Sequence, residues 1–391
     1  MKKMLAMLMA AMMVLALAAC GGTGSSSSSQ AASGSQAASG SEAASGSETA
    51  SAGIPKEDLK IGFLYVGPVG DEGYSYAHDQ GRKAMVEALG LDESQTLVVE
   101  NVPETSDCEK TVRDLIDQGC NVIYATSFGH GEWVDIVAKD HPEVYFGHAT
   151  GILTEDNLST YMGRAYEARY LSGIVAGMNS KSGKIGYVAG VSIPEVIRGI
   201  DAFTLGVRSV NPEATVEVLW TNQWYAPADE KNAAQQLINK GCDLIAQHCD
   251  TTGPQIAAQE AGVLAIGYNA STLSAAPEAY LTAPLFHWDA YYTRDVQSII
   301  DGTRPKGERF WGGLTTGMVS LDDLSDNCVE GTAEAVEEAK AKIESGELFV
   351  FTGPLKDNEG NEVVADGVKM TDDEMESMMW LVEGVIGNVA A

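Results

Sequence analysis

The stretch Lys60-Ile61-Gly62-Phe63-Leu64-Tyr65-Val66 decides the fold, because this short β-rich run opens a unit that recurs along the chain. Beyond a glycine-rich turn, small and apolar residues follow at helical spacing up to Gly90: Ala77, Ala84, Met85, Ala88 and Leu89. A strand, a turn and a helix in this order form the first part of a βαβ unit.

Strand and helix patterns then alternate along the chain. We predict strands at 96–101, 121–126 and 144–149, with helices at 106–118 and 132–139 between them. Strands joined by crossover helices form a parallel sheet that is covered on both faces. The sequence therefore predicts an α/β fold.

A second series begins after a helix rich in small residues at 165–179. The opening pattern returns there as Lys184-Ile185-Gly186-Tyr187-Val188-Ala189, which we interpret as the start of a second lobe. Its predicted elements are helices 195–210, 228–240 and 254–260, strands 215–221, 244–248, 264–268 and 280–284, and then a helix at 288–302.

The C-terminal part adds a predicted helix at 332–345 and a hairpin that pairs 349–351 with 362–364. Two similar lobes followed by further segments fit the type I periplasmic-binding architecture, in which the chain crosses several times between two Rossmann-like lobes. The expected bounds are 54–182 with about 285–320 for the first lobe, and 183–284 with about 321–391 for the second. A ligand should bind between the C-terminal ends of the strands of both lobes.

The chain begins with the features of an export signal. Met1-Lys2-Lys3 precedes the uncharged apolar run Met4–Ala19. The alternative, a spanning helix, would need about 20 apolar residues, more than this run contains. Because the run ends in Leu17-Ala18-Ala19-Cys20, which matches the bacterial lipobox, we predict a signal peptide at 1–19 and a lipid on Cys20. The protein should then be anchored on the outer face of the cytoplasmic membrane.

Residues 20–53 are predicted to form a flexible tether. Ser-Gln-Ala-Ala-Ser-Gly at 29–34 recurs at 35–40, and a variant with Glu follows at 41–46. Such small polar residues cannot build a core, and a period of six is too short for a solenoid repeat.

Composition excludes several classes of partner. A formal net charge of −30 should repel nucleic acid and anionic lipid surfaces. Five cysteines remain besides Cys20, an odd number, and we interpret most of them as small buried hydrophobes. Metal-ligand spacings of cysteine, HExxH, GxSxG and P-loop signatures are missing from the sequence. We expect no metal, no cofactor and no enzymatic activity.

Candidate ligand contacts stand where predicted strands end. After the first strand, Asp71 could bond a polar ligand edge, while Tyr74 and Tyr76 could offer flat faces. In the alternative interpretation, Asp71 or Ser75 caps the following helix and the tyrosines are half buried on it. The glycines of this loop follow GxxGxxG rather than GxGxxG, so a dinucleotide site is weakly supported.

Trp224 and Tyr225 occupy the corresponding place in the second lobe, between a strand and a helix start at Pro227. Stacking of an aromatic side chain on a base contributes about 1–3 kcal/mol. An indole here could equally plug the loop. The remaining candidates at strand ends are Phe128, Asp250 and Asn269. Trp288 lies beyond a predicted crossing strand, where its side chain could face the cleft or the hinge.

From about Lys60 to Tyr292 the chain resembles the basic membrane protein family of ABC-transporter binding lipoproteins. The resemblance implies a type I binding-protein fold, a purine base or nucleoside as ligand, and ABC permease and ATPase subunits as partners. We expect a monomer. The segments that carry the resemblance are 67–71, 76–82, 125–129, 166–173, 194–200 and 211–212.

By this resemblance, Tyr76 and Trp224 take the places of two stacking aromatics. Asp71 matches an acidic residue of the same loop, and Phe128 matches a residue beside the pocket. We therefore expect a planar ligand between Tyr76 and Trp224, with Asp71 and Asn269 bonding its polar edges.

Three departures from the nucleoside-binding relatives favour a free base. Ala77 stands where they have Asn, Asn269 and Ser271 stand where they carry acidic residues, and Trp288 stands near the place of a Lys that contacts ribose. The alternatives are another small planar ligand, or a surface receptor that reports its ligand to a signalling partner.

Overall fold

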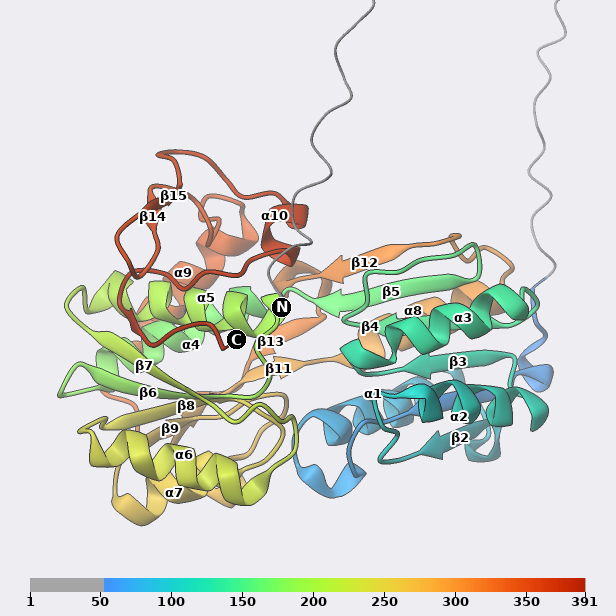
Figure 1. Ribbon diagram of the computed structural model, residues 1–391, viewed down its shortest axis with the longest axis horizontal. Helices are drawn as coiled ribbons and strands as arrows, with labels where there is room; N and C mark the ends of the chain where they lie inside the picture. Colours follow the sequence, from blue (N-terminus) through green and yellow to red (C-terminus); the bar gives the residue numbers. More distant parts are fainter. Residues whose placement is uncertain (1–52, 391) are drawn as a thin grey trace, which may run out of the picture. The chain divides into compact units, whose positions relative to one another are not determined.

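The computed structural model describes residues 53–390, which form two lobes connected by several chain crossings (Figure 1). The predicted signal peptide, Cys20 and the predicted tether up to residue 52 lie outside the described residues. Each lobe is built on a six-stranded parallel sheet, so the predicted two-lobed α/β architecture is confirmed. Within residues 53–390, no helix is both long enough and apolar enough to span a bilayer.

The first sheet has the strand order β12-β5-β4-β3-β1-β2. In Figure 1 the orange β12 lies beside the green β5, although the second lobe separates them in sequence. The strands are β1 Ile61–Leu64, β2 Thr96–Val99, β3 Val122–Ala125, β4 Tyr145–Ala149, β5 Leu158–Gly163 and β12 Arg309–Gly312.

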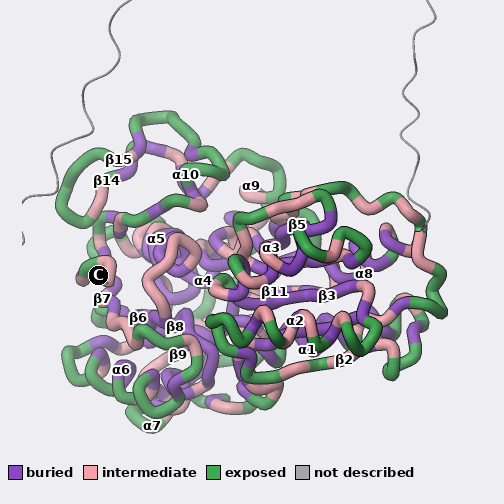
Figure 2. Tube along the Cα trace, turned by 45° about the vertical axis from the view of Figure 1, so that its right-hand side comes forward, coloured by how far each residue is buried: buried purple, intermediate pink, exposed green. Residues whose placement is uncertain are grey.

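Helices cover both faces of this sheet, which explains why β1 and β3 are buried at every residue. On one face, α1 (Tyr74–Leu89) packs with α8 (Trp288–Ile300). On the other face lie α2 (Ser106–Asp117) and α3 (Gly131–Asp140). Figure 2 shows the strands as buried tube between helices whose outer sides are exposed.

The second sheet has the order β10-β9-β8-β6-β7-β16, again with parallel neighbours. Its strands are β6 Lys184–Ala189, β7 Thr215–Trp220, β8 Leu244–His248, β9 Leu264–Ile266, β10 Tyr280–Thr282 and β16 Val385–Ile386. One face is covered by α4 and α5 and the other by α6 and α7. These helices are α4 Ala165–Asn179, α5 Pro194–Val210, α6 Pro227–Asn239 and α7 Gly253–Ala261.

Two glycines allow α4 and α5 to pack at very short distance. A Cβ at Gly173 would lie 2.1 Å from the carbonyl oxygen of Phe203, and one at Gly206 would lie 2.0 Å from that of Tyr170. Because of this contact, Leu171 of α4 belongs to the core of the second sheet. Helix α4 therefore packs with the second sheet, although it lies within the bounds expected for the first lobe.

The two lobes are connected where β5 leads into α4 and through two further strands. These are β11 (Pro284–Phe286) and β13 (Val319–Leu321), which pair antiparallel. β11 leads into α8 of the first lobe, and β13 returns the chain from β12. The repeated crossing agrees with the predicted hinge.

The C-terminal segment packs on the second lobe through α9 (Thr332–Glu344) and α10 (Asp372–Glu376), while β16 extends the sheet beyond β7. The predicted hairpin pairs differently, because β15 (Glu362–Val364) pairs with β14 (Leu355–Lys356) rather than with 349–351. The latter segment contains Phe351, which is fully buried in the core. Short 3-10 helices lie at Lys56–Asp58, Val69–Asp71, Glu93–Gln95, Phe128–His130, Leu273–Ala275 and Leu314–Thr316.

A fully buried carboxyl holds this C-terminal segment to α5. Asp201 accepts a hydrogen bond of 2.9 Å from the backbone N–H of Val382, while its second oxygen has no partner among the described residues. Burial raises the pKa of Asp201 well above its ordinary value, against the lowering effect of the Val382 hydrogen bond. The carboxyl therefore takes up a proton on folding, and its contribution to stability falls as pH rises above about 4, the unfolded value.

Asp201→Asn should stabilise the protein at pH 8, because the amide still accepts the Val382 N–H but never ionises. We expect a gain on the order of 1–2 kcal/mol at pH 8 that shrinks toward pH 4, measured by urea unfolding. Asp79→Asn is the control of opposite sign. Burial opposes ionisation of Asp79, but hydrogen bonds from Lys83 and Arg82 hold its pKa low. Loss of the Asp79 carboxylate should therefore destabilise the protein at pH 8. An effect of Asp201→Asn on stability that does not change with pH would contradict the raised pKa of Asp201.

Candidate ligand-binding site

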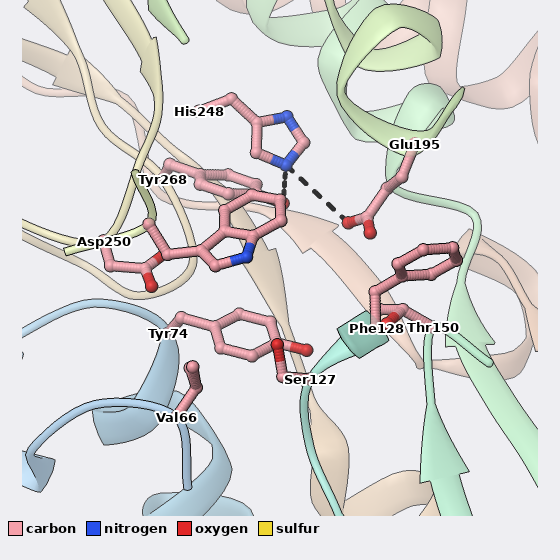
Figure 3. Close-up of a pocket in the computed structure, with 10 residues that line it drawn as sticks. Val66, Tyr74, Ser127, Phe128, Thr150, Glu195, His248, Asp250 and Tyr268 are labelled. Carbon is pink, nitrogen blue, oxygen red and sulfur yellow. Dashed lines mark hydrogen bonds and ion pairs between the residues drawn. The ribbon is translucent and has the colours of Figure 1, made fainter. Parts of the chain in front are cut away.

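A pocket opens where the carboxyl ends of the strands of both lobes meet, and five residues of each lobe line it (Figure 3). The space between them, including what is open to solvent, is about 340 Å³. The lining residues are Val66, Tyr74, Ser127, Phe128 and Thr150 of the first lobe and Glu195, Trp224, His248, Asp250 and Tyr268 of the second.

Tyr74, the first residue of α1, forms part of the first-lobe wall. Its hydroxyl donates a hydrogen bond to the carbonyl oxygen of Thr126. Its ring meets His78 edge to face, with centroids 4.5 Å apart, and His78 in turn stacks on Trp288 at 3.9 Å. These buried rings hold the Tyr74 side chain in one orientation.

Ser127, Phe128 and Thr150 complete the first-lobe side. Ser127 and Phe128 follow β3, and Thr150 directly follows β4. The Thr150 hydroxyl is buried without a hydrogen-bond partner among the described residues, so it is free to bond a ligand. Phe128 is 39% exposed, which leaves one face of its ring open.

The second-lobe side combines an indole with two carboxyl groups. Trp224 lies in the loop between β7 and α6, and its carbonyl oxygen accepts a hydrogen bond of 3.0 Å from the N–H of Asp250. Glu195 is in the first turn of α5. Asp250 follows β8 closely. The side chains of Glu195 and Asp250 thus approach the pocket from different elements, as Figure 3 shows.

His248 connects these groups at the end of β8. Its Nε2 lies 2.9 Å from the hydroxyl of Tyr268 and 3.7 Å from a carboxylate oxygen of Glu195. Burial lowers the pKa of His248 to about 4, so the imidazole is neutral near pH 7 and its contact with Glu195 is not an ion pair. Burial also raises the pKa of Asp250 well above its ordinary value, and the carboxylate of Asp71 adds to this effect.

Four of the eight predicted site residues meet in this pocket, and four do not line it. Tyr74, Phe128, Trp224 and Asp250 are brought together. The carboxylate of Asp71 instead accepts hydrogen bonds of 2.8, 2.8 and 2.9 Å from the backbone N–H groups of Gly73, Ser75 and Tyr76. This geometry matches the capping alternative, because it satisfies the donors that a helix start leaves free.

The other three lie outside the pocket for different reasons. Tyr76 is on the outer side of α1 and 37% exposed. Trp288 has no exposed surface, and its ring is stacked between His78 and Phe286 in the first-lobe core. Asn269 is buried in a left-handed conformation with φ 70°, and neither end of its amide has a partner among the described residues.

Six lining residues were not singled out by the sequence. Thr150 directly follows the predicted strand 144–149 and Tyr268 is the last residue of the predicted strand 264–268, so examining every strand end would have found them. Ser127 and His248 stand in strand-end segments that were considered for other residues. Val66 closes the first predicted strand, whereas Glu195 carries no local signal because only the tertiary fold brings it to His248. Within residues 53–390, no group of three or more His, Cys, Asp or Glu side chains could hold a metal ion.

Two parallel-sheet lobes with a pocket at the carboxyl ends of both sets of strands form the type I binding-protein fold, with the pocket where small molecules bind in such sheets. A solved solute-binding protein of an ABC transporter system from Aeropyrum pernix has the same fold, with a TM-score of 0.66 and 21% identity over 76% of this chain and 93% of that one. Residues 58–352 match the family of PnrA-like ABC transporter substrate-binding proteins. The chain belongs to this family, so the predicted family and the type I binding-protein fold are both confirmed.

Two relatives carry names that differ in ligand. A purine-binding protein of Brucella abortus is 42% identical over 330 residues, which are 84% of this chain and 93% of that protein. A putative ABC transporter glucose-binding protein of Haloferax volcanii is 38% identical over 333 residues, 85% of this chain and 82% of that protein.

Proposed function

We propose that the protein captures a purine base outside the cytoplasmic membrane and delivers it to an ABC importer. The observation that carries this proposal is the meeting of aromatic rings from both lobes with two carboxyl groups of the second lobe in one pocket. The purine-binding relative supports it.

The chemistry of the lining favours a planar heterocycle with N–H donors. Tyr74 and Phe128 of the first lobe and Trp224 and Tyr268 of the second lobe all line the pocket, so a flat ring can meet aromatic side chains from both lobes. Glu195 and Asp250 offer acceptors for ring or amino N–H groups. None of the lining residues is Lys or Arg, which disfavours ligands with phosphate or carboxylate groups.

The proposed contacts therefore differ from those expected from sequence. Tyr74 or Phe128 replaces Tyr76 as the stacking partner of Trp224. Glu195 and Asp250 replace Asp71 and Asn269 at the polar edges of the ring, because the Asp71 carboxylate is already occupied by backbone N–H groups.

A hexose is the second candidate. The glucose-binding relative favours it, and an aromatic face with neighbouring carboxylates also suits the apolar face and hydroxyl groups of a sugar. Calorimetry separates the two candidates. Residues 21–391 are titrated with adenine, guanine, hypoxanthine, adenosine, glucose and adenosine monophosphate.

We expect a purine base to bind most tightly and the nucleotide to bind poorly, because its phosphate would approach two carboxyl groups. Binding of glucose without any purine would replace the first candidate by the second. If none of these compounds binds, both candidate ligands are wrong.

The proposal includes a lipid anchor on Cys20, a permease and an ATPase as partners, and a monomeric state. The lipobox at 17–20 supports the anchor. Metabolic labelling with palmitate should mark the wild-type chain but not Cys20→Ala. Co-purification from membranes should recover the permease, whereas recovery of a sensor kinase would favour the alternative role as a receptor for a signalling partner.

A further inference from the structure

A fully buried arginine lies behind the second-lobe wall of the pocket. Arg169 is in α4 and has no exposed surface. Its Nη1 donates a hydrogen bond of 2.8 Å to the carbonyl oxygen of Gln247, the residue before His248. Its guanidinium carbon lies 3.8 Å from the ring centroid of Tyr268. One side chain therefore contacts two of the segments that form this wall.

The charge of Arg169 is poorly compensated where it stands. Its Nε and Nη2 have no hydrogen-bond partner among the described residues, and its Nη1 is bonded to a backbone carbonyl rather than to a carboxylate. Burying such a charge destabilises a fold, and an apolar residue of similar size would pack between helices at lower cost. Packing alone does not account for an arginine at this position.

The packing of α5 leaves space between the guanidinium and His248. A Cβ at Gly199 would lie 3.1 Å from Nδ1 of His248 and 3.6 Å from Nε of Arg169. Glycine at this position thus lets the two polar side chains approach each other across the helix.

The positive charge of Arg169 acts on a pocket whose charged lining residues are all acidic. Burial is the largest cause of the low pKa of His248, Arg169 and Arg198 lower it further, and Glu195 opposes them. A protonated His248, 3.7 Å from Glu195, would form an ion pair and withdraw that carboxylate from a ligand. The groups that face His248 are Glu195 and Arg198 of α5, Arg169 of α4 and Tyr268 after β9.

We propose that Arg169 is a positioning residue for ligand binding, which fixes Tyr268 and the end of β8 and whose charge opposes protonation of His248. The carboxylate of Glu195 then stays available to accept a hydrogen bond from the ligand. The part of this inference that concerns adenine rests on the proposed function, whereas the effect on His248 does not.

The first test measures adenine binding at pH 7. Arg169→Met should lower the affinity about tenfold to a hundredfold, because the cation–π contact with Tyr268 and the bond to Gln247 are lost together. Arg169→Lys keeps the charge and should recover part of the loss.

Arg198→Met is the matched control. This second buried arginine also opposes protonation of His248, but its hydrogen bond and its ring contact are to Met375 and Trp311 rather than to Gln247 and Tyr268. Its loss should lower thermal stability and reduce adenine affinity much less than Arg169→Met does. Equal losses of affinity in the two variants would overturn the proposal.

The second test follows the titration of His248 by NMR in the ligand-free protein, with its signal assigned by its absence in His248→Gln. His248 should titrate near pH 4 in the wild type and at nearly the same pH in Arg169→Lys. In Arg169→Met it should titrate at higher pH. A purely structural role would lower stability without moving this titration. If Arg169→Met does not fold, Gly199→Ala serves instead, because its methyl group displaces the imidazole and should raise the pH of titration.

The two tests separate the two proposals. Absence of adenine binding in wild type would overturn the proposed ligand, while a shifted His248 titration would still support the role of Arg169. An unshifted titration in a folded Arg169→Met overturns the role of Arg169, whatever the ligand.

Discussion

Gly73→Ala should abolish closure of the two lobes around a ligand and lower adenine affinity about a hundredfold, since a steric penalty near 3 kcal/mol corresponds to that factor. A Cβ on Gly73, at the start of α1, would lie 2.2 Å from the carbonyl oxygen of Asp250 in the other lobe. The backbone angles of Gly73, φ −129° and ψ −120°, are also unfavourable for a residue with a side chain. The substitution therefore opposes the interlobe contact directly.

Gly70→Ala is the matched control, because a Cβ there meets nothing within 4 Å in the same loop. It should bind adenine like wild type. Small-angle scattering with saturating adenine should show a more extended particle for Gly73→Ala than for wild type or Gly70→Ala. Wild-type affinity and compactness in Gly73→Ala would contradict the assignment of this contact to closure.

Trp224→Ala should lower adenine affinity tenfold to a hundredfold. The indole lines the pocket together with Tyr74 and Phe128, and loss of one stacking face costs about 1–3 kcal/mol. The Trp224 ring also packs on Gly190, so truncation opens space at the end of β6. Calorimetry on the variant measures the change in affinity.

Tyr225→Ala is the neighbouring control, since Tyr225 is 44% exposed and does not line the pocket. Its adenine affinity should equal that of wild type. A small effect of Trp224→Ala would mean that the indole closes the loop rather than stacking on a ligand, as the other sequence interpretation holds.

The fold could be predicted well from sequence, because each strand and helix of a βαβ unit has its own local pattern. The expected bounds 184–189, 244–248 and 165–179 are those of β6, β8 and α4. The strands β5 and β12 were missed. β5 contains Ser159 and Thr160, buried polar residues that do not form an apolar run, and the short β12 exists only through pairing with β5.

The site could be predicted only in part, because strand ends are readable but side-chain directions are not. Tyr74 and Tyr76 illustrate this. Residues two positions apart on a helix with 3.6 residues per turn point to nearly opposite sides, so only one of them can face the pocket. Asp71 is a second example, since the same carboxylate suits a ligand or a helix start and only the coordinates show its three backbone donors.

The interleaved path of the chain has a consequence for folding after export. β12 pairs with β5 at one side of the first sheet, yet it follows the strands β6 to β11 in sequence. A nascent chain that has emerged only as far as Gly163 presents β5 as an open edge, with backbone groups able to pair with another chain. The sheet of the first lobe is complete only once residue 312 is available, so the two lobes must fold together. A chain that is truncated within the second lobe should therefore aggregate rather than form a folded first lobe.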